Sequence, residues 1–275
     1  MTQGNFSAFE KITSTANLKI KNFQHLQKAR ERKKQHLFVV EGTKEIEMAI
    51  NAGYNFSQFF YCPEILNPAF FDLIREKLGE KVIVNEVTRD VYNHISYRED
   101  AEGITGWAVP WPHALLDLKP GRNPLVLVLE SVEKPGNLGA ILRTADAAGL
   151  DAVIICDPQT DIYNPNVIRS SLGAVFTVPI GIASTQETII WLKEYHMAIF
   201  CTSLTASIPY TNINFSVPSA IVMGSEATGL SVNWLKFSDR NIIIPMKGKV
   251  DSMNVSVSAG IVIFEALRQR KQRRK

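Results

Sequence analysis

The sequence lacks the features that mark membrane-spanning, secreted and disulfide-rich proteins. No apolar run reaches the roughly 18–20 residues that a helix needs to cross a bilayer, and residues 1–10 do not place a charged segment before an apolar one, as a secretory signal does. The chain has three cysteines, Cys62, Cys156 and Cys201, which are far apart and form no CxxC pair. A disulfide framework or a cysteine-bound zinc is therefore not expected, and the apolar context of each cysteine predicts a buried thiol. These absences predict a cytoplasmic protein that does not enter the membrane.

Patterns for metal and dinucleotide binding are absent as well. The five histidines have no spacing typical of metal ligands, so no metal site is expected. No G-x-G-x-x-G follows the first apolar strand of either half of the chain, and the KPGNLG segment at residues 134–139 does not have that form. The sequence therefore disfavours a Rossmann-type dinucleotide enzyme.

Positive charge is concentrated in two short clusters. The net charge is +3, but the eight C-terminal residues hold six basic side chains and no acidic one, and without them the chain has 24 basic and 27 acidic residues. The second cluster comprises Lys28, Arg30, Arg32, Lys33 and Lys34. Such clusters in a nearly neutral protein are typical of a surface that binds a polyanion such as RNA. A solvated helix face and a frayed tail explain the charge pattern equally well when it is taken alone.

Prolines divide the chain into two α/β domains. Residues 109–124 contain four prolines, which disfavour helix and indicate an extended linker. We expect an N-terminal domain at residues 1–110, a linker at 111–123 and a C-terminal domain at 124–275.

The two domains differ in their hydrophobic patterns. In the N-terminal domain, short strands alternate with helices; the strands are expected at 37–40, 58–61, 82–84 and 103–109, and the helices at 42–52, 69–78 and 87–95. The C-terminal domain contains continuous apolar runs, which are typical of strands buried on both faces of a parallel sheet, at 125–129, 152–155, 198–200, 220–223 and 242–244. Helices are expected between these runs at 138–148, 188–195 and 230–237, and from about residue 254 onward.

Three loops at the ends of these C-terminal strands carry unusual polar residues, at the edge where parallel sheets bind ligands. The first, at residues 130–143, contains Asn137 as a plausible helix N-cap and Arg143 six residues later, on a different face of the helix. The second, GSEATGLS at residues 224–231, has two glycines that let backbone amides approach a ligand.

The third loop, IPMKGKVDSMNVSVSAG at residues 244–260, has a run of small polar residues at the start of a helix. Ser252 or Asn254 would cap that helix, which leaves the other polar groups to bind a ligand. Taken singly, each of the three loops is also consistent with an ordinary turn between a strand and a capped helix.

Taken together, the three loops resemble motifs 1, 2 and 3 of the SpoU/TrmH family of RNA ribose methyltransferases, in the SPOUT superfamily, in residue type, order and spacing. The resemblance covers about residues 125–270. Residues 18–109 resemble the ribosomal L30e-like substrate-binding domain that often precedes this catalytic domain. The resemblance implies an S-adenosylmethionine-dependent enzyme that methylates a ribose 2'-hydroxyl of RNA, and a parallel-sheet α/β domain with a deep trefoil knot.

Homodimers are typical of the family, and a dimer would complete a site to which both Asn137 and Arg143 contribute. It would also give a partner to the apolar stripe of the last helix, which comprises Val257, Ile261, Phe264 and Leu267.

The resemblance also assigns site residues by motif position. The implied catalytic residues are Asn137, Arg143, Ser252 and Asn254. Arg143 is the essential one, and we expect it to orient the RNA phosphate and ribose rather than to take the proton, because an arginine is a poor base. The implied cofactor-binding residues are Thr202, Leu204, Gly224, Glu226, Ile244, Met246 and Met253.

The RNA target stays open. An additional N-terminal domain favours 23S ribosomal RNA, since many members that act on transfer RNA lack one, and transfer RNA is the alternative. An antibiotic-resistance enzyme that acts on the ribosome would share every motif. A non-catalytic RNA-binding protein on the same fold is disfavoured, because Arg143, Asn254 and the Gly224 loop are intact.

Overall fold

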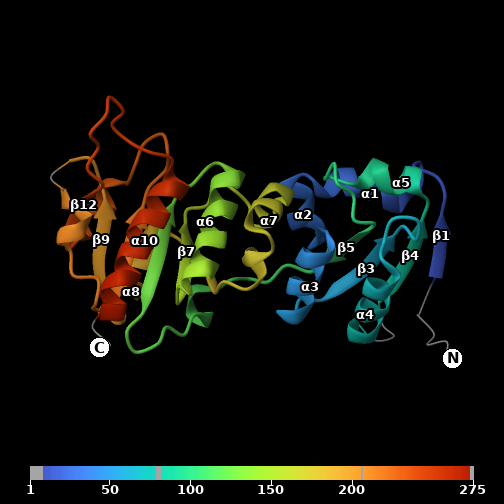
Figure 1. Ribbon diagram of the computed structural model, residues 1–275, viewed down its shortest axis with the longest axis horizontal. Helices are drawn as coiled ribbons and strands as arrows, with labels where there is room; N and C mark the ends of the chain where they lie inside the picture. Colours follow the sequence, from blue (N-terminus) through green and yellow to red (C-terminus); the bar gives the residue numbers. More distant parts are fainter. Residues whose placement is uncertain (1–8, 79–81, 206, 273–275) are drawn as a thin grey trace. The chain divides into compact units, whose positions relative to one another are not determined.

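The computed structural model describes residues 9–78, 82–205 and 207–272. The chain forms two compact units, one made of residues 1–111 and 163–177 and the other of residues 112–162 and 178–275. The first unit therefore contains a segment, 163–177, that lies within the sequence of the second. Figure 1 shows the helices and strands of both units.

The first unit is built on a five-stranded mixed sheet in the order β1-β4-β3-β5-β2. β5 runs antiparallel to β2 and β3, and the other neighbours are parallel. The strands are β1 (Phe9–Ile12), β2 (Phe38–Glu41), β3 (Phe56–Tyr61), β4 (Ile83–Val87) and β5 (Ile104–Ala108), and the helices are α1 (Leu18–Leu26), α2 (Ala29–Gln35), α3 (Thr43–Asn51), α4 (Pro68–Leu78) and α5 (Arg89–Ile95). The predicted alternation of strands and helices is confirmed, whereas β1, α1 and α2 were not predicted.

The N-terminal basic cluster lies on α2 and the turn before it, and one of its members is buried. Arg32 is 4% exposed, and its Nη1 donates to the carbonyl oxygens of Leu26 (2.8 Å) and Gln27 (2.8 Å). The guanidinium thus binds carbonyl groups that the end of α1 leaves without helical partners. The predicted RNA contact is therefore wrong for Arg32, while the other four members, Lys28, Arg30, Lys33 and Lys34, are exposed.

The segment 163–177 completes an aromatic cluster in the first unit. It forms α7 (Pro165–Ser171) and the short 3-10 helix η2 (Ala174–Phe176). The ring of Tyr163 stacks on Phe38 with the ring centroids 4.0 Å apart, and its hydroxyl lies 3.2 Å from that of Tyr54. The ring of Phe176 meets Tyr54 edge-on at 5.1 Å. The core of the first unit is therefore built from residues on both sides of the predicted linker.

The second unit contains a seven-stranded sheet, in the order β10-β12-β9-β11-β6-β7-β8, in which every pair of neighbours is parallel. Its strands are β6 (Leu125–Glu130), β7 (Ala152–Cys156), β8 (Ile180–Ala183), β9 (Ala198–Thr202), β10 (Ile208–Pro209), β11 (Ser219–Met223) and β12 (Arg240–Ile243). β6, β7 and β11 are buried along their whole length, as continuous apolar runs predict. The predicted parallel α/β fold is confirmed, although β8 and β10 were not predicted.

Helices cover both faces of this sheet. They are α6 (Pro135–Ala148), α8 (Thr185–Glu194), α9 (Val232–Phe237) and α10 (Val255–Gln272), with short 3-10 helices η1 (Leu115–Asp117) and η3 (Tyr210–Asn212). α6 and α10 pack side by side, as Figure 1 shows, and α8 contacts α9. α6 begins three residues earlier than predicted because proline is favoured at the first helical position. None of the helices within the described ranges combines the length and apolarity that crossing a bilayer requires.

All three cysteines are buried and free, as the sequence predicts. Burial raises the pKa of the Cys156 and Cys201 thiols to about 12. Neither thiol is therefore ionised near neutral pH, which is typical of a structural cysteine.

One side chain of the C-terminal basic tail, that of Arg270, connects α10 to other segments of the second unit. The guanidinium of Arg270 donates to four backbone carbonyl oxygens, at 2.7–2.9 Å, which belong to Asn123, Pro124, Phe215 and Val217. Arg268 pairs with Glu265 at 2.7 Å. The predicted RNA contact is therefore wrong for Arg270. The remaining basic residues of the tail are Lys271, which is exposed, and residues 273–275, which lie outside the described residues.

Replacing Arg270 with alanine should lower the free energy of unfolding by about 2–3 kcal/mol, because four carbonyl groups lose a charged donor. Urea denaturation followed by circular dichroism measures this change. The control is Lys271→Ala, since Lys271 is exposed and should change the stability by less than about 0.5 kcal/mol. Equal stability of the two variants would contradict the structural role of Arg270.

Candidate active site

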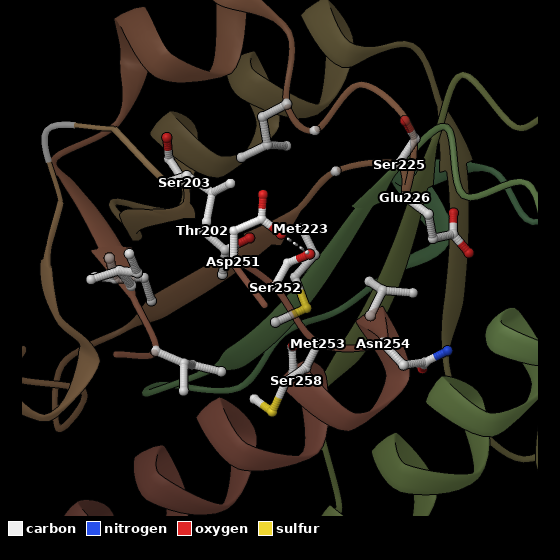
Figure 2. Close-up of a pocket in the computed structure, with 18 of the residues that line it drawn as sticks. Thr202, Ser203, Met223, Ser225, Glu226, Asp251, Ser252, Met253, Asn254 and Ser258 are labelled. Carbon is white, nitrogen blue, oxygen red and sulfur yellow. Dashed lines mark hydrogen bonds between the residues drawn. The ribbon is translucent and has the colours of Figure 1, made fainter. Parts of the chain in front are cut away.

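A cavity of about 870 Å³ opens in the second unit where β9, β11 and β12 end (Figure 2). This volume is within the range of small-molecule sites. Its walls come from the start of α6, with Lys134 and Asn137, and from four further segments, at residues 202–205, 223–230, 242–246 and 251–255. The three loops selected from the sequence therefore meet at one cavity, because the carboxyl ends of parallel strands lie at the same edge of a sheet.

The loop after β11 is closed on itself around Gly224. The Ser225 carbonyl accepts from the Gly229 amide at 3.0 Å, and the Ser225 hydroxyl accepts from the Thr228 amide at 3.1 Å. A Cβ atom at position 224 would overlap the backbone of Gly229 and the Leu230 nitrogen. Only glycine allows this close approach, which leaves the backbone of the turn accessible from the cavity.

Glu130, at the end of β6, fixes the far end of the same loop. This carboxylate is 6% exposed, and it accepts from the Ser231 amide at 2.7 Å and from the Thr185 hydroxyl at 3.0 Å. Both carboxylate oxygens therefore have a donor, as a buried charged group requires. Sequence reasoning did not single out Glu130, because its two donors come from segments 55 and 101 residues away.

Side chains from the three loops form one hydrogen-bonded chain. Asn254 Nδ2 donates to Asn137 Oδ1 at 3.0 Å, and Asn137 Nδ2 donates to Glu226 Oε1. All three residues line the cavity, and Figure 2 shows Glu226 and Asn254 on the same side of it. The chain fixes the orientation of the Asn137 amide, because its oxygen and its nitrogen both have partners.

The two predicted helix caps have different outcomes. Asn137 is not the N-cap of α6, because Lys134 occupies that position and Asn137 is the third residue of the helix. Its side chain is therefore available for the chain to Glu226. Asn254 does cap α10, since its Oδ1 accepts from the amide of Ser256 at 2.9 Å. Ser252 is not needed as a cap and lines the cavity.

All seven residues predicted to bind the cofactor line this cavity, namely Thr202, Leu204, Gly224, Glu226, Ile244, Met246 and Met253. Their contributions differ in chemistry: four are apolar and suit a purine, Gly224 offers backbone groups, and Glu226 carries a negative charge. S-adenosylmethionine combines an adenine with a cationic sulfonium and an amino-acid end, so these groups fit it. Sequence reasoning missed Tyr210 and Asp251, which also line the cavity.

Arg143 does not line the cavity. It lies six residues after Asn137 on the exposed side of α6, whose buried side chains include Leu138, Ile141 and Leu142. Among the residues that the structure describes, none forms a hydrogen bond or an ion pair with its guanidinium. The structure thus brings together three of the four predicted catalytic residues, Asn137, Ser252 and Asn254, and leaves Arg143 outside their cavity.

Metal ligands are not gathered in the described part of the chain. No group of three or more histidine, cysteine, aspartate or glutamate side chains there is arranged to hold a metal ion.

The chain matches the SpoU rRNA Methylase family over residues 124–264 and the MRM3-like substrate binding domain over residues 17–106. It is 28% identical over 255 residues to a 23S rRNA guanosine 2'-O-methyltransferase of Bacillus subtilis, with 93% of this chain and 98% of that protein covered. It is 30% identical over 270 residues to an uncharacterized tRNA/rRNA methyltransferase of Synechocystis, with 94% and 93% covered.

Solved structures give the same result. The chain is similar to an RNA 2'-O ribose methyltransferase, with a TM-score of 0.81, 38% identity, and 95% of this chain and 99% of that chain covered. It is also similar to an AdoMet-bound rRNA methyltransferase from Sinorhizobium meliloti, with a TM-score of 0.88, 30% identity, and 94% and 98% covered. The family predicted from the three loops is confirmed, and with it the enzyme class and the methyl donor: this chain belongs to the SpoU rRNA methylase family, whose members transfer methyl groups from S-adenosylmethionine to RNA.

Proposed function

We propose that this protein transfers a methyl group from S-adenosylmethionine to a ribose 2'-hydroxyl of 23S ribosomal RNA. The observation that carries the proposal is the hydrogen-bonded chain of Asn254, Asn137 and Glu226 at the wall of the cavity. It joins the three sequence motifs in one place, and it contains one of the seven residues expected to hold the cofactor, Glu226, while the other six line the same cavity.

Bound S-adenosylmethionine supplies an electrophilic methyl carbon on a sulfonium. The side chains of Leu204, Ile244, Met246 and Met253 would pack around its adenosine part and exclude water there. Ser252 and Asn254 would hydrogen-bond the acceptor ribose, and the fixed amide of Asn137 would keep Asn254 in place. Such alignment supplies much of the rate acceleration when two bound groups must meet in line.

The proton of the ribose hydroxyl must leave as its oxygen bonds to the methyl carbon. Arg143 is exposed and without a partner among the described residues, so its guanidinium is available to bind an RNA phosphate. Its positive charge beside the ribose would favour loss of the proton to water. We therefore assign Arg143 to orienting and polarising the acceptor nucleotide, because a guanidinium does not accept protons at ordinary pH.

Ribosomal RNA is supported as the substrate by the N-terminal unit. Residues 17–106 match a substrate-binding domain, and the similar Bacillus subtilis protein modifies 23S rRNA. The exposed Lys28, Arg30, Lys33 and Lys34 provide charge for phosphate contacts that give affinity without sequence information. Transfer RNA is the alternative substrate, since other relatives carry a tRNA/rRNA description.

Two further features belong to this proposal. The resemblance to SPOUT enzymes supports a trefoil knot formed by the segments around 224–230 and 244–254. A ribosomal substrate supports action in the cytoplasm.

A homodimer is supported by the surface of α10. Its buried side chains are Ala259, Val262, Ile263 and Ala266, so the predicted apolar stripe faces another way. Val257 and Phe264 of that stripe are 52% and 51% exposed. Exposed apolar side chains in a row favour a protein interface, and a second copy would bring another Arg143 close to a cavity that lacks its own.

Phe264→Glu should convert the dimer to a monomer and abolish methyl transfer, because it places a charge in the apolar interface. Light scattering coupled to gel filtration measures the mass, and labelled methyl transfer measures activity. The control is Leu116→Glu, at a side chain of the same unit that is 86% exposed and lies on η1 instead of α10. A Phe264→Glu protein that stays dimeric would contradict the proposal that α10 forms the dimer interface.

Isotopically labelled S-adenosylmethionine tests the function, with purified protein and either ribosomal RNA or transfer RNA. We expect label in ribosomal RNA, in a 2'-O-methyl linkage that resists alkaline cleavage. Label in transfer RNA alone would support the proposed methyl transfer but contradict ribosomal RNA as the substrate. Failure to bind S-adenosylmethionine would contradict the enzyme proposal and favour a non-catalytic RNA-binding protein.

A further inference from the structure

One acidic side chain of the cavity takes no part in the chain of Asn254, Asn137 and Glu226. Asp251 lies in the loop before α10 and lines the cavity, where Figure 2 shows it near Thr202 and Ser252. The Ser252 hydroxyl is 3.5 Å from Asp251 Oδ1, which is the long limit of a hydrogen bond. No basic side chain among the described residues forms an ion pair with Asp251.

The wall of the cavity has more acidic than basic side chains. Its acidic side chains are Glu226 and Asp251, and its basic side chain is Lys134. Glu226 accepts a hydrogen bond from Asn137, whereas Asp251 has only the long contact with Ser252. Two lysines of the same loop, Lys247 and Lys249, are exposed and do not line the cavity. A wall of this kind favours a ligand that brings positive charge.

We propose that the Asp251 carboxylate stabilises the sulfonium charge of S-adenosylmethionine and thereby makes the cavity prefer the methyl donor to the demethylated product. The inference rests on the proposed function. S-adenosylhomocysteine keeps the adenosine, ammonium and carboxylate groups and differs in lacking the methyl group and the sulfonium charge. A carboxylate close to the sulfur therefore raises the affinity for the methyl donor above that for the product. A carboxylate close to the ammonium group, which both ligands have, affects the two affinities equally.

The neighbouring Ser252 places Asp251 at the sulfur end of the ligand. If Ser252 and Asn254 hold the acceptor ribose, the ribose oxygen and the methyl carbon must come within about 3–3.5 Å of each other for reaction. Because Asp251 lines the same cavity and its Oδ1 lies 3.5 Å from the Ser252 hydroxyl, the sulfonium would then lie close to the Asp251 carboxylate. Stabilising the bound donor in this way increases its affinity without accelerating methyl transfer, because the sulfonium charge disappears during the reaction.

Calorimetric titration of the full-length protein tests the inference with three ligands. S-adenosylmethionine carries the sulfonium, sinefungin carries a protonated amine at the same position, and S-adenosylhomocysteine is neutral there. Asp251→Asn should weaken the binding of S-adenosylmethionine and of sinefungin by about fivefold to tenfold, and the binding of S-adenosylhomocysteine by less than about twofold. Asp251→Glu should restore most of the preference. Glu194→Gln, which removes an exposed charge of α8 outside the cavity, is the matched control and should change none of the three affinities.

Other results contradict the inference in distinguishable ways. Equal losses for all three ligands would assign Asp251 to the structure of the loop or to the ligand's ammonium group. Unchanged binding with a collapsed rate of methyl transfer would make Asp251 a proton acceptor instead. A wild-type protein that binds none of the ligands would contradict the proposed function itself.

Discussion

Replacing Arg143 with alanine should reduce methyl transfer by about 10²–10³-fold, the usual effect of removing a group that stabilises charge in the transition state. The same variant should bind S-adenosylmethionine as the wild type does, because Arg143 does not line the cavity. It should also fold normally, since the side chain is exposed on α6 and has no partner among the described residues. Single-turnover methyl transfer and calorimetric titration measure the two quantities separately.

Two further variants sharpen this test. Arg122→Ala removes an exposed arginine of the same unit, in the linker, and should leave the rate unchanged. Arg143→Lys keeps the charge but loses the planar fork that binds a phosphate through two hydrogen bonds, so it should recover only part of the rate. Full activity of Arg143→Ala would exclude Arg143 from the chemistry and direct attention to the cavity's own carboxylates.

Gly224→Ala should weaken S-adenosylmethionine binding by at least about 100-fold. The added Cβ atom would overlap backbone atoms of Gly229 and Leu230, which cannot rotate away as a side chain can. The loop must therefore open, and the cavity wall moves with it. Calorimetric titration measures the affinity, and thermal unfolding shows whether the unit stays folded.

A second glycine provides the matched control for this prediction. Gly248 lies in another loop of the same unit, and a Cβ atom there would meet nothing within 4 Å. Gly248→Ala should therefore retain the wild-type affinity. Normal cofactor binding by Gly224→Ala would show that the turn adapts and that its tight closure does not shape the site.

The sequence was most informative about the second unit. Its buried strands are continuous apolar runs. A strand that is covered on both faces lacks the alternation of apolar and polar residues that is typical of a strand at the surface, so it is easy to recognise. The polar loops between them stand out against these runs. For that reason the edge of the sheet at which the cavity opens could be predicted, and all seven residues expected to bind the cofactor line that cavity.

Individual contacts were less predictable, because they depend on partners far away in the sequence. Arg32 and Arg270 look like members of RNA-binding clusters, yet each binds backbone carbonyl groups within its own unit. Asn137 has the residue type of a helix cap, but the N-cap of α6 is Lys134, three residues earlier, which frees the Asn137 side chain. Tyr210 comes to the cavity from the three-residue 3-10 helix η3, which is too short for any periodicity to reveal.

The segment 163–177 limits how RNA recognition can be exchanged between related enzymes. The chain passes between its two units three times, after residues 111, 162 and 177. A chimera joined only at the proline-rich linker would place Phe38 and Tyr54 of one protein against the Tyr163 and Phe176 equivalents of another. Recombination within the family must therefore transfer residues 163–177 together with residues 1–111, or repack the aromatic cluster that the two stretches share within the first unit. The unit that contains the substrate-binding domain is therefore not inherited as one uninterrupted stretch of sequence.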